Sequence, residues 1–483
     1  MPDSSSLATE QYRQELSRSL SLRGNVLITL SAVTPASSVF IIIPAVLVAI
    51  GGASFVAFLA AAVVGVFMAL CYAELASAFP IAGGEYAFAG RVLGKSTGFA
   101  LFLMNLLSVV MIIGVIALGT GQYLSAAFSS ANSKWVGVAV IVVCAGVAIL
   151  NIRTNAWVTG TFLALEMAAL LVVCVLGFVH ISRPVSTLWH AQTIGSHGTL
   201  VGVAAGLVAA QTATAIFAYN GYGAAVYFSE ETRGASRVMG KVILISLAVT
   251  VAAEIIPMTA VLLGAPSLQR LLSDASPMTY FVTARGSDAL NTIVSLAIAL
   301  AIINATIAII LQGGRMLYSA ARDRAFPDGV SRPLAYVHPT LQTPVWATLI
   351  VGLAAAVVAS VVPINSLIVA TGATLVALYV IVALSAFVGR RTGVTSHAPY
   401  KMAAYPLPPI LVVLALLYVA TQVWKGNPWQ VIITLVALAV GYLYYFAYLH
   451  TRRDRWTMRA TAPAETEPHG EIALGPVGGL EGL

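Results

Sequence analysis

Apolar residues along this chain gather in long runs that short polar stretches separate. Twelve of these runs are about 20 residues long or a little longer, the length that an α-helix needs to cross a hydrocarbon core of about 30 Å. The pattern therefore predicts an all-α polytopic membrane protein with twelve transmembrane helices. The expected spans are residues 25–50, 54–79, 97–127, 135–152, 155–180, 200–230, 238–264, 287–320, 343–362, 365–389, 403–424 and 427–450.

Two of the twelve runs are interrupted by helix-breaking residues. The first contains Thr34–Ser38 with Pro35, and the sixth contains Asn220–Gly223 with two glycines. Proline removes a backbone donor, and glycine costs about 1 kcal/mol relative to alanine inside a helix. The interrupted runs are five spans apart, which is typical of inverted-repeat transporters whose broken helices bind substrate. For either break alone, a simple kink or close helix packing is the alternative.

The composition strengthens the membrane interpretation. Hydrophobic residues make up 59% of the chain and charged residues only 9%, whereas soluble domains carry about 25% charged residues. The net charge of +7 does not indicate nucleic-acid binding, because the basic residues lie in the loops between apolar runs. The three cysteines each lie in an apolar run, so no disulfide framework is expected.

The distribution of basic residues predicts the orientation in the membrane. Of the 25 Lys and Arg residues, 20 fall in the loops and termini on one side, and the remaining five fall on the other. Because cytoplasmic loops are enriched in Lys and Arg, we expect a multi-pass protein of the cell (plasma) membrane with both termini in the cytoplasm. The five exceptions are Lys134, Arg183, Arg270, Arg285 and Lys425.

Three stretches resemble a known transporter family. Tyr72–Tyr86 (YAELASAFPIAGGEY) is similar to the segment that follows the second helix in that family, and Phe217–Glu231 is similar to its broken sixth helix. Asn304–Pro327, with Arg315 and Tyr318, resembles its eighth helix and the loop that follows. On these stretches the chain is identified as a member of the amino acid–polyamine–organocation (APC) superfamily.

The resemblance implies a LeuT-like fold of five-plus-five inverted repeats, with the first and sixth helices broken. It divides the chain into a cytoplasmic segment (1–24), a ten-helix core (25–390, repeats about 25–180 and 200–390), two peripheral helices (391–450) and a disordered tail (451–483). It also implies a secondary transporter, not an enzyme, that moves amino acids by alternating access. A polyamine or other organic amine is the alternative substrate.

The two breaks are the expected substrate site. A break exposes backbone N–H groups, which suit an anionic substrate group, and C=O groups, which suit a cationic one. In the first span, Ala36–Val39 lack the glycines of many relatives, which leaves less room for a substrate carboxylate. The residues expected to bind substrate are Thr34, Ala36, Ser37, Ser38, Val39, Phe217, Ala218, Tyr219, Asn220 and Tyr222.

Two acidic residues lie within apolar spans. Glu166 is in the fifth span and Glu254 is in the seventh. An ionised carboxylate at membrane depth costs several kcal/mol unless it is paired or reached by water, so both are candidates for proton coupling. The resemblance places Glu166 near the first break, where several relatives carry a Lys. The alternatives are a neutral structural acid or a side chain that faces an aqueous vestibule.

Other polar residues indicate a gate or pathway. Glu230 and its neighbour Glu231 end the sixth span, where they are expected to pair with arginines such as Arg315 or Arg322. Alternatively, Glu230 faces the pathway and recognises a second ammonium. Asn304 lies mid-span in the eighth helix and is a further pathway candidate. Glu74 and Glu85, which flank a glycine-containing turn, are expected to be gate or topology residues and not ligands.

Several other functions lack their usual signals. The spacing of His180, His190 and His197 matches no metal signature, and the sequence contains no phosphate-binding loop. We therefore expect no metal and no cofactor, only a small-molecule substrate, the lipid bilayer and a proton as coupling ion. A channel would be expected to show a pore-loop signature, and a membrane enzyme would be expected to show catalytic groups at membrane depth.

Overall fold

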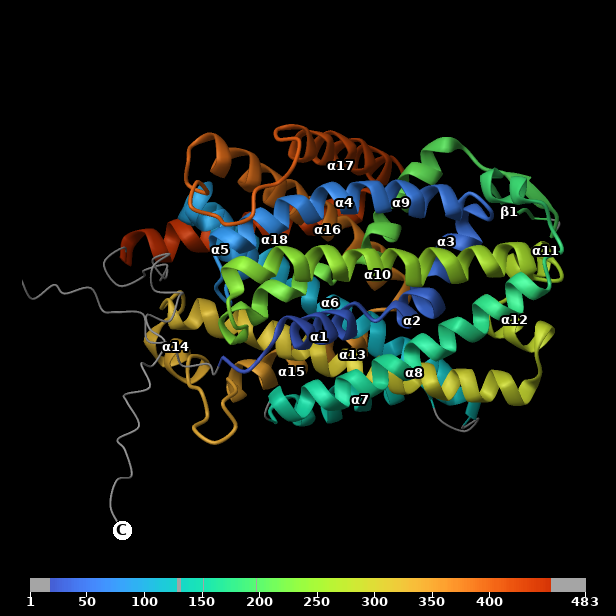
Figure 1. Cartoon of the computed structure of the whole chain (residues 1–483), viewed down its shortest axis with the longest axis horizontal. Helices are drawn as coiled ribbons and strands as arrows, with labels where there is room; N and C mark the ends of the chain where they lie inside the picture. Colours follow the sequence, from blue (N-terminus) through green and yellow to red (C-terminus); the bar gives the residue numbers. More distant parts are fainter. Residues whose placement is uncertain (1–17, 128–131, 151, 197, 453–483) are drawn as a thin grey trace, which may run out of the picture.

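The computed structural model describes residues 18–127, 132–150, 152–196 and 198–452, and these form a bundle of long helices. The helices run along the long axis of the molecule (Figure 1), with α5 and α14 at one end and β1, α11 and α12 at the other. We call the end with α5 and α14 the arginine-rich face, because Arg322 and Arg390 lie there, and the other end the opposite face. The expected segments 1–24 and 451–483 fall largely outside the described residues.

The first span is broken, and the break is narrower than the sequence predicts. Helix α1 (Leu22–Val33) ends at Thr34, whose φ of 47° lies in the left-handed region, and α2 (Pro35–Ser37) begins directly afterwards. The chain then forms a π-helical turn, η1 (Ser38–Ile42), and continues as α3 (Ile43–Ile50). One residue therefore carries the interruption, and Pro35 takes the first helical position, where its missing N–H costs nothing.

The sixth span is also broken, and its start differs from the expectation. Residues Leu200–Gly202 form strand β2, paired antiparallel with β1 (Gln192–Ile194), so helix α9 (Ala205–Tyr219) begins after residue 200. The hairpin turn at Gly198, with φ of 71°, stabilises the extended conformation of this apolar stretch. After Asn220 and Gly221 the chain resumes as a 3₁₀ helix, η3 (Tyr222–Glu231).

Within the described residues, nine helical segments are long and apolar enough to cross a membrane. Two shorter apolar helices, α7 and α15, correspond to the fourth and ninth expected spans, and the broken α9–η3 pair corresponds to the sixth. The fold is therefore that of an all-α polytopic membrane protein. The nine segments are Leu22–Ile50, Ser54–Ala78, Lys95–Gly121, Gly160–Val179, Ala235–Gly264, Asp288–Arg322, Ile364–Arg391, Leu407–Gly426 and Pro428–Arg452.

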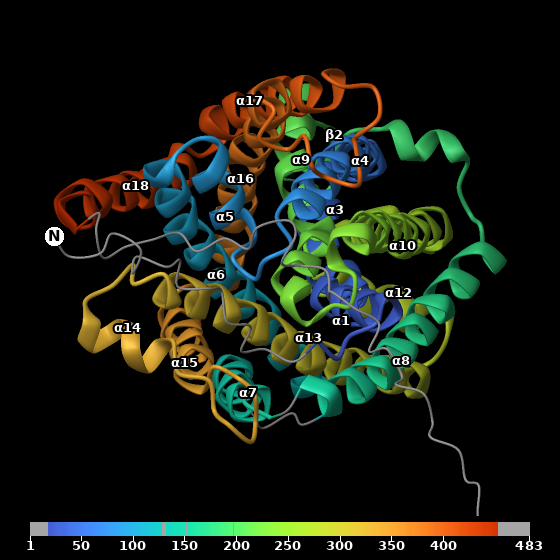
Figure 2. The same cartoon turned by 60° about the vertical axis from the view of Figure 1, so that its left-hand side comes forward.

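The remaining elements surround the two broken helices (Figure 2). The first broken helix packs against α8, α10, α13 and η3, while α9 packs against α4, α16 and α17. The other helical elements of the described residues are α4 (Ser54–Ala78), α5 (Gly84–Val92), α6 (Lys95–Ala127), α7 (Ser133–Ala148), α8 (Ile152–Val179), η2 (Val185–Trp189), α10 (Ala235–Gly264), α11 (Leu268–Ser273), α12 (Pro277–Arg285), α13 (Asp288–Arg322), α14 (Asp328–Leu334), α15 (Val345–Val361), α16 (Ile364–Arg391), α17 (Leu407–Gly426), α18 (Pro428–Tyr444), η4 (Tyr445–Leu449) and η5 (His450–Arg452).

Candidate substrate site between the two broken helices

The two helix breaks lie against each other in the centre of the bundle. Gly221 has φ of 120°, and a Cβ atom added to it would come within 2.8 Å of the Val33 Cα atom. Glycine is therefore required here both for the backbone conformation and for the close approach. The Ser38 hydroxyl donates to the Ala218 carbonyl at 2.9 Å, which ties the two breaks together.

A small cavity of about 20 Å³ lies between the breaks. A cavity of this volume holds about one water molecule, so the site is closed around a space smaller than an amino acid. Five of the residues expected from the sequence line it: Ser37, Ser38, Phe217, Ala218 and Asn220. The other lining residues are Ala32, Val33, Ile42, Ile112, Ile116, Gly221, Ile309 and Gln312.

The backbone donors of the first break are engaged within the chain. The Ala36 N–H donates to Glu166 Oε1 at 2.7 Å, and the Thr34 hydroxyl donates to the same oxygen at 3.2 Å. The N–H groups of Ser37 and Ser38 both donate to the Thr34 carbonyl, at 3.0 and 3.2 Å. The donors expected for a substrate carboxylate are thus occupied, and Glu166 fills the anion position. Its location beside the first break is confirmed.

Glu254 approaches the same break from α10. It is fully buried, as Glu166 is, and the Ser38 hydroxyl faces it. Among the described residues no hydrogen bond of normal geometry reaches either oxygen of Glu254 or Oε2 of Glu166. No Lys, Arg or His forms an ion pair with either carboxylate in this part of the chain. Two acidic groups without a protein cation therefore flank the break.

The remaining expected substrate residues lie beside the cavity and do not line it. Val39 is fully buried, and the Tyr219 hydroxyl donates to the Phe58 carbonyl at 3.2 Å. The Tyr222 ring packs edge-on against Tyr72, with ring centroids 6.1 Å apart. The pathway candidate Asn304 is buried in α13 and is not among the lining residues.

Ion pairs close the arginine-rich face. Arg322 forms a bidentate pair with Glu230, with both N–O distances at 3.1 Å, and Glu230 also accepts the Ala82 N–H at 3.0 Å. The neighbouring Glu231 pairs with the fully buried Arg315 at 2.5 Å. The expected pairing of both glutamates with loop-side arginines is confirmed. These pairs join the inner end of η3 to α13 and to the turn before α5.

Two further glutamates reinforce this face. Glu74 pairs with Arg390 at 3.3 Å and accepts the Met402 N–H at 2.8 Å, which connects α4 to the end of α16 and the following loop. Glu85 accepts the Tyr72 hydroxyl at 2.7 Å and also contacts Tyr227 of η3. Both side chains are buried.

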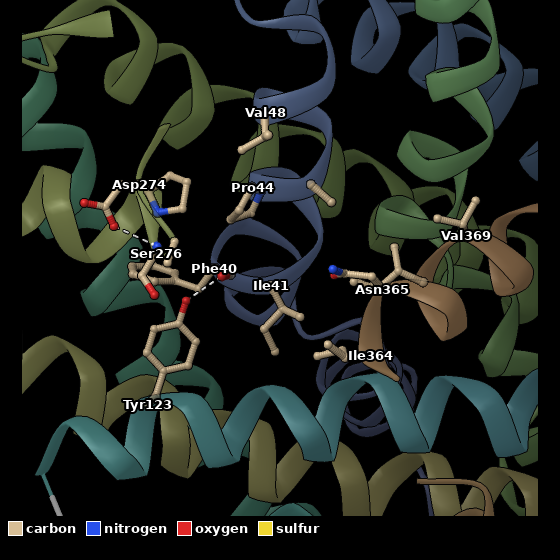
Figure 3. A pocket seen from close by; sticks show the side chains of 14 residues that line it. Phe40, Ile41, Pro44, Val48, Tyr123, Asp274, Ser276, Ile364, Asn365 and Val369 are labelled. Carbon is tan, nitrogen blue, oxygen red and sulfur yellow. Dashed lines mark hydrogen bonds between the residues drawn. The ribbon is translucent and has the colours of Figure 1, made fainter. Parts of the chain in front are cut away.

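A larger hollow opens toward the opposite face. Its volume is about 400 Å³, and Phe40 and Ile41 of η1 line it, next to Ile42 of the central cavity (Figure 3). The Tyr123 hydroxyl donates to the Phe40 carbonyl, and Asp274 and Asn365 contribute polar groups to the lining. The bundle is therefore sealed at one end and hollowed at the other.

Eight residues that line the cavity are not among those expected from the sequence, and four of them lie outside the two broken helices. Ile112 and Ile116 come from α6, and Ile309 and Gln312 come from α13. All four lie in continuous apolar spans, where the pattern does not show which side of a helix faces the centre. Two signals were present in the sequence: the two isoleucine residues in α6 are four apart and therefore on one helical side, and Gln312 is a polar residue within an apolar span.

Sequence comparisons agree with this architecture. The profile of the family described as "Amino acid permease" matches residues 20–448 of the chain. An uncharacterized transporter of Mycobacterium tuberculosis is 29% identical over 348 residues, which cover 72% of this chain and 74% of that protein.

Two proteins of Bacillus subtilis are more distant relatives. Its methylthioribose transporter is 23% identical over 417 residues, covering 82% of this chain and 86% of that protein. Its branched-chain amino acid permease is 23% identical over 415 residues, covering 81% of this chain and 85% of that protein. With the family profile spanning nearly the whole helical bundle, the chain belongs to the amino acid permease family of the APC superfamily.

Proposed function

We propose that this protein is a secondary active transporter that carries amino acids across the cell membrane by alternating access, coupled to protons. The observation that carries the proposal is the cavity between the two helix breaks, with Glu166 bound to the Ala36 N–H. Broken helices are where transporters of this kind bind substrate. The relatives named as amino acid permeases support the same substrate class.

The lining of the cavity supports a small substrate with an apolar side chain. Ile112, Ile116 and Ile309 form one side, while Ser37, Asn220 and Gln312 supply polar groups. No charged side chain is among the lining residues described here. Because the cavity holds only about one water, we propose that this conformation is substrate-free and that the breaks separate when substrate binds.

We assign the arginine-rich face to the cytoplasm, with both termini on that side. The excess of Lys and Arg in its loops supports this orientation. The closed ion pairs of Glu230 and Glu231 and the hollow beside Phe40 then describe an outward-facing arrangement with a shut inner gate. In this proposal Glu230 is a gate residue that separates from Arg322 when the transporter opens inward.

Proton coupling is assigned to Glu166 and Glu254. A buried carboxylate without a cation is more stable when it carries a proton, and neither residue forms an ion pair in the described chain. Protonation of Glu166 weakens its hold on the Ala36 N–H and frees that donor for a substrate carboxylate. A proton from the more acidic side of the membrane would in this way free the Ala36 N–H for the substrate carboxylate.

An organic amine is the second candidate substrate. The observation that favours it is that Ala36, Ser37 and Ser38 have no free backbone N–H for a carboxylate, whereas two acidic side chains flank the break. Such a site is rich in acceptors and suits an ammonium group.

Uptake into proteoliposomes tests both candidates. We expect saturable accumulation of a radiolabelled neutral amino acid that rises with an inward proton gradient, and little uptake of the matching amine that lacks the carboxylate. The Glu166→Gln variant should take up amino acid without responding to the gradient. Uptake of the amine alone would replace the first candidate by the second. If no amino acid or amine accumulates, the transport proposal is wrong.

A further inference from the structure

One buried carboxyl group at the arginine-rich face has no place in the transport scheme above. Glu85 is the second residue of α5 and is only 4% exposed. Its Oε1 atom accepts the Tyr72 hydroxyl of α4 at 2.7 Å, and its Oε2 atom accepts the Asn105 amide of α6 at 3.3 Å. Tyr227 of η3 also hydrogen-bonds to Oε2. Glu85 therefore joins four elements, including the inner half of the broken sixth helix.

Glu85 differs from the other glutamates of this face because its neighbours are neutral. Glu74, Glu230 and Glu231 each pair with an arginine, whereas no ion pair to Glu85 occurs among the described residues. Its titratable neighbours are tyrosines of the elements packed around it. They are Tyr72 of α4, Tyr222 and Tyr227 of η3, and Tyr379 of α16.

This environment accommodates the protonated acid. A carboxylic acid has one O–H donor, and the Tyr227 oxygen, which already accepts the Asn105 amide at 2.6 Å, has a second lone pair for it. The Tyr72 hydroxyl then donates to the remaining oxygen. Burial raises the pKa of Glu85, and the hydrogen bonds from Tyr227, Tyr72 and Asn105 only partly oppose that effect.

A continuous set of contacts connects Glu85 to the central cavity. The Tyr72 ring lies 6.1 Å from the rings of both Tyr222 and Tyr379, and those two rings are 6.3 Å apart. The Tyr379 hydroxyl donates to Asn220 Oδ1 at 3.1 Å, and Asn220 lines the cavity. Packed side chains therefore connect Asn220 to the hydrogen-bond partners of Glu85 without a gap.

We propose that Glu85 is a proton-binding site that keeps the arginine-rich face closed and releases its proton to water when η3 separates from α5. The O–H bond at Oε2 breaks heterolytically on opening, the proton passes to a water molecule, and the hydrated carboxylate remains. Water at the same face returns the proton on closing. This inference rests on the proposed function insofar as it assumes that the face opens.

The direction of the pH effect follows from linkage. The closed state holds Glu85 buried with a raised pKa, whereas the open state exposes it to water, where a carboxyl has its ordinary, lower pKa. The proton therefore stabilises the closed state. That stabilisation is fully present below the ordinary pKa and is lost as the pH rises through the raised pKa, so alkaline pH favours opening.

Hydrogen–deuterium exchange of η3 in the full-length protein tests this site. In detergent, at alkaline pH, we expect the amides of residues 222–231 to exchange about tenfold more slowly in Glu85→Gln than in the wild type, since one linked proton changes an equilibrium about tenfold per pH unit. At acidic pH the two proteins should exchange alike. Comparing variants at equal pH cancels the intrinsic pH dependence of exchange.

Two further variants keep the result decisive. Tyr227→Phe removes the oxygen that receives the proton, so η3 should exchange faster than in the wild type at acidic pH. Tyr442→Phe, which removes a hydroxyl bonded to Thr97 elsewhere in the bundle, is the matched control and should leave η3 unchanged.

Faster exchange in Glu85→Gln, or an unchanged ratio to wild type at every pH, would overturn the assignment. If Glu85→Gln does not fold, Tyr227→Phe alone decides, and an unchanged exchange rate at acidic pH then rejects the site. The readout is independent of uptake. Failure of the transport proposal therefore appears as absent accumulation, and failure of this inference appears as pH-insensitive exchange.

Discussion

Two pairs of buried carboxylates in this transporter differ in one respect, which is the presence of a cation. Glu230 and Glu231 at the arginine-rich face each pair with an arginine, at 3.1 and 2.5 Å. Glu166 and Glu254 at the helix breaks are buried at least as deeply, yet no ion pair to either occurs in the described chain. Burial is common to both pairs, so the difference lies in charge compensation.

Charge compensation determines which role each pair of carboxylates can have. Removing one partner of a buried ion pair is costly, because the other charge stays buried without compensation. The ion pairs of Glu230 and Glu231 are therefore suited to stabilise one conformation. A buried acid without a protein cation requires a proton or a mobile cation from outside. Glu166 and Glu254 are therefore suited to proton coupling, while Glu230 and Glu231 with their arginines are suited to keep the arginine-rich face closed.

Removal of the Arg315 charge should have the largest effect on stability. We expect Arg315→Met to lower the free energy of unfolding by about 3–5 kcal/mol, because Glu231 is left as an uncompensated buried charge. Denaturant unfolding in detergent measures the loss. The exposed Arg332→Met is the control and should change stability little. The double variant Arg315→Met with Glu231→Gln should recover most of the loss, and failure to recover would show that the pair is not the cause.

The Arg322–Glu230 pair should affect conformation more than folding. Arg322 lies nearer the surface than Arg315, with a side chain 9% exposed, so solvent compensates part of the lost charge. We expect Arg322→Gln to cost about 2 kcal/mol of the closed state. Cysteine-labelling of an introduced Ser229→Cys, in a background without native cysteines, should then speed up by more than about tenfold. Unchanged labelling would mean that the pair does not hold the gate.

Neutralising Glu254 should have the opposite effect to the arginine variants, namely a small loss of stability and a large loss of proton coupling. Since neither oxygen of Glu254 has a hydrogen-bond partner of normal geometry in the described residues, Glu254→Gln should change the free energy of unfolding by less than about 1 kcal/mol. Uptake driven by an inward proton gradient should fall to the level seen without a gradient. A destabilisation as large as that of Arg315→Met would erase the distinction between the two pairs.

A change in the shape of the cavity between the helix breaks should have the smallest effect of these variants. Ile116 lines the cavity, and Ile116→Val removes one methylene from the apolar side. We expect the half-saturation concentration for a branched substrate to rise by roughly threefold to tenfold, since one methylene in such a pocket is worth about 1 kcal/mol. Measured uptake of a smaller substrate serves as the control. A larger effect on the smaller substrate would place the side-chain pocket elsewhere.

The sequence predicted those parts of the molecule in which a residue interrupts a run of apolar residues. Pro35 and Gly221 interrupt apolar runs, and the helices break at Thr34 and at Asn220–Gly221. Glu166 and Glu254 were visible for the same reason, because carboxylates are rare in apolar spans. The pairing of Glu230 with Arg322 followed from opposite charges at the ends of neighbouring spans.

Features formed by apolar residues within apolar runs could not be predicted from the sequence. Ile309 lines the cavity, but the long span that carries it is apolar on nearly every side, so no periodicity marks the side that faces the cavity. Strand β2, Leu200–Gly202, falls within the expected sixth span because its residues are as apolar as those of the helix that follows. The sequence predicts Glu85 only as a gate or topology residue, and the tertiary contacts with Tyr72, Asn105 and Tyr227 are what indicate a proton-binding site.

The contact between Gly221 and Val33 has a mechanical consequence. A bulky side chain at such a crossing would have to change rotamer before one half-helix moved past the other, and each such change adds an activation cost. Gly221 places no side chain against the Val33 Cα and Cγ2 atoms. The glycine therefore adds no rotamer barrier of its own to a movement of the two half-helices past each other.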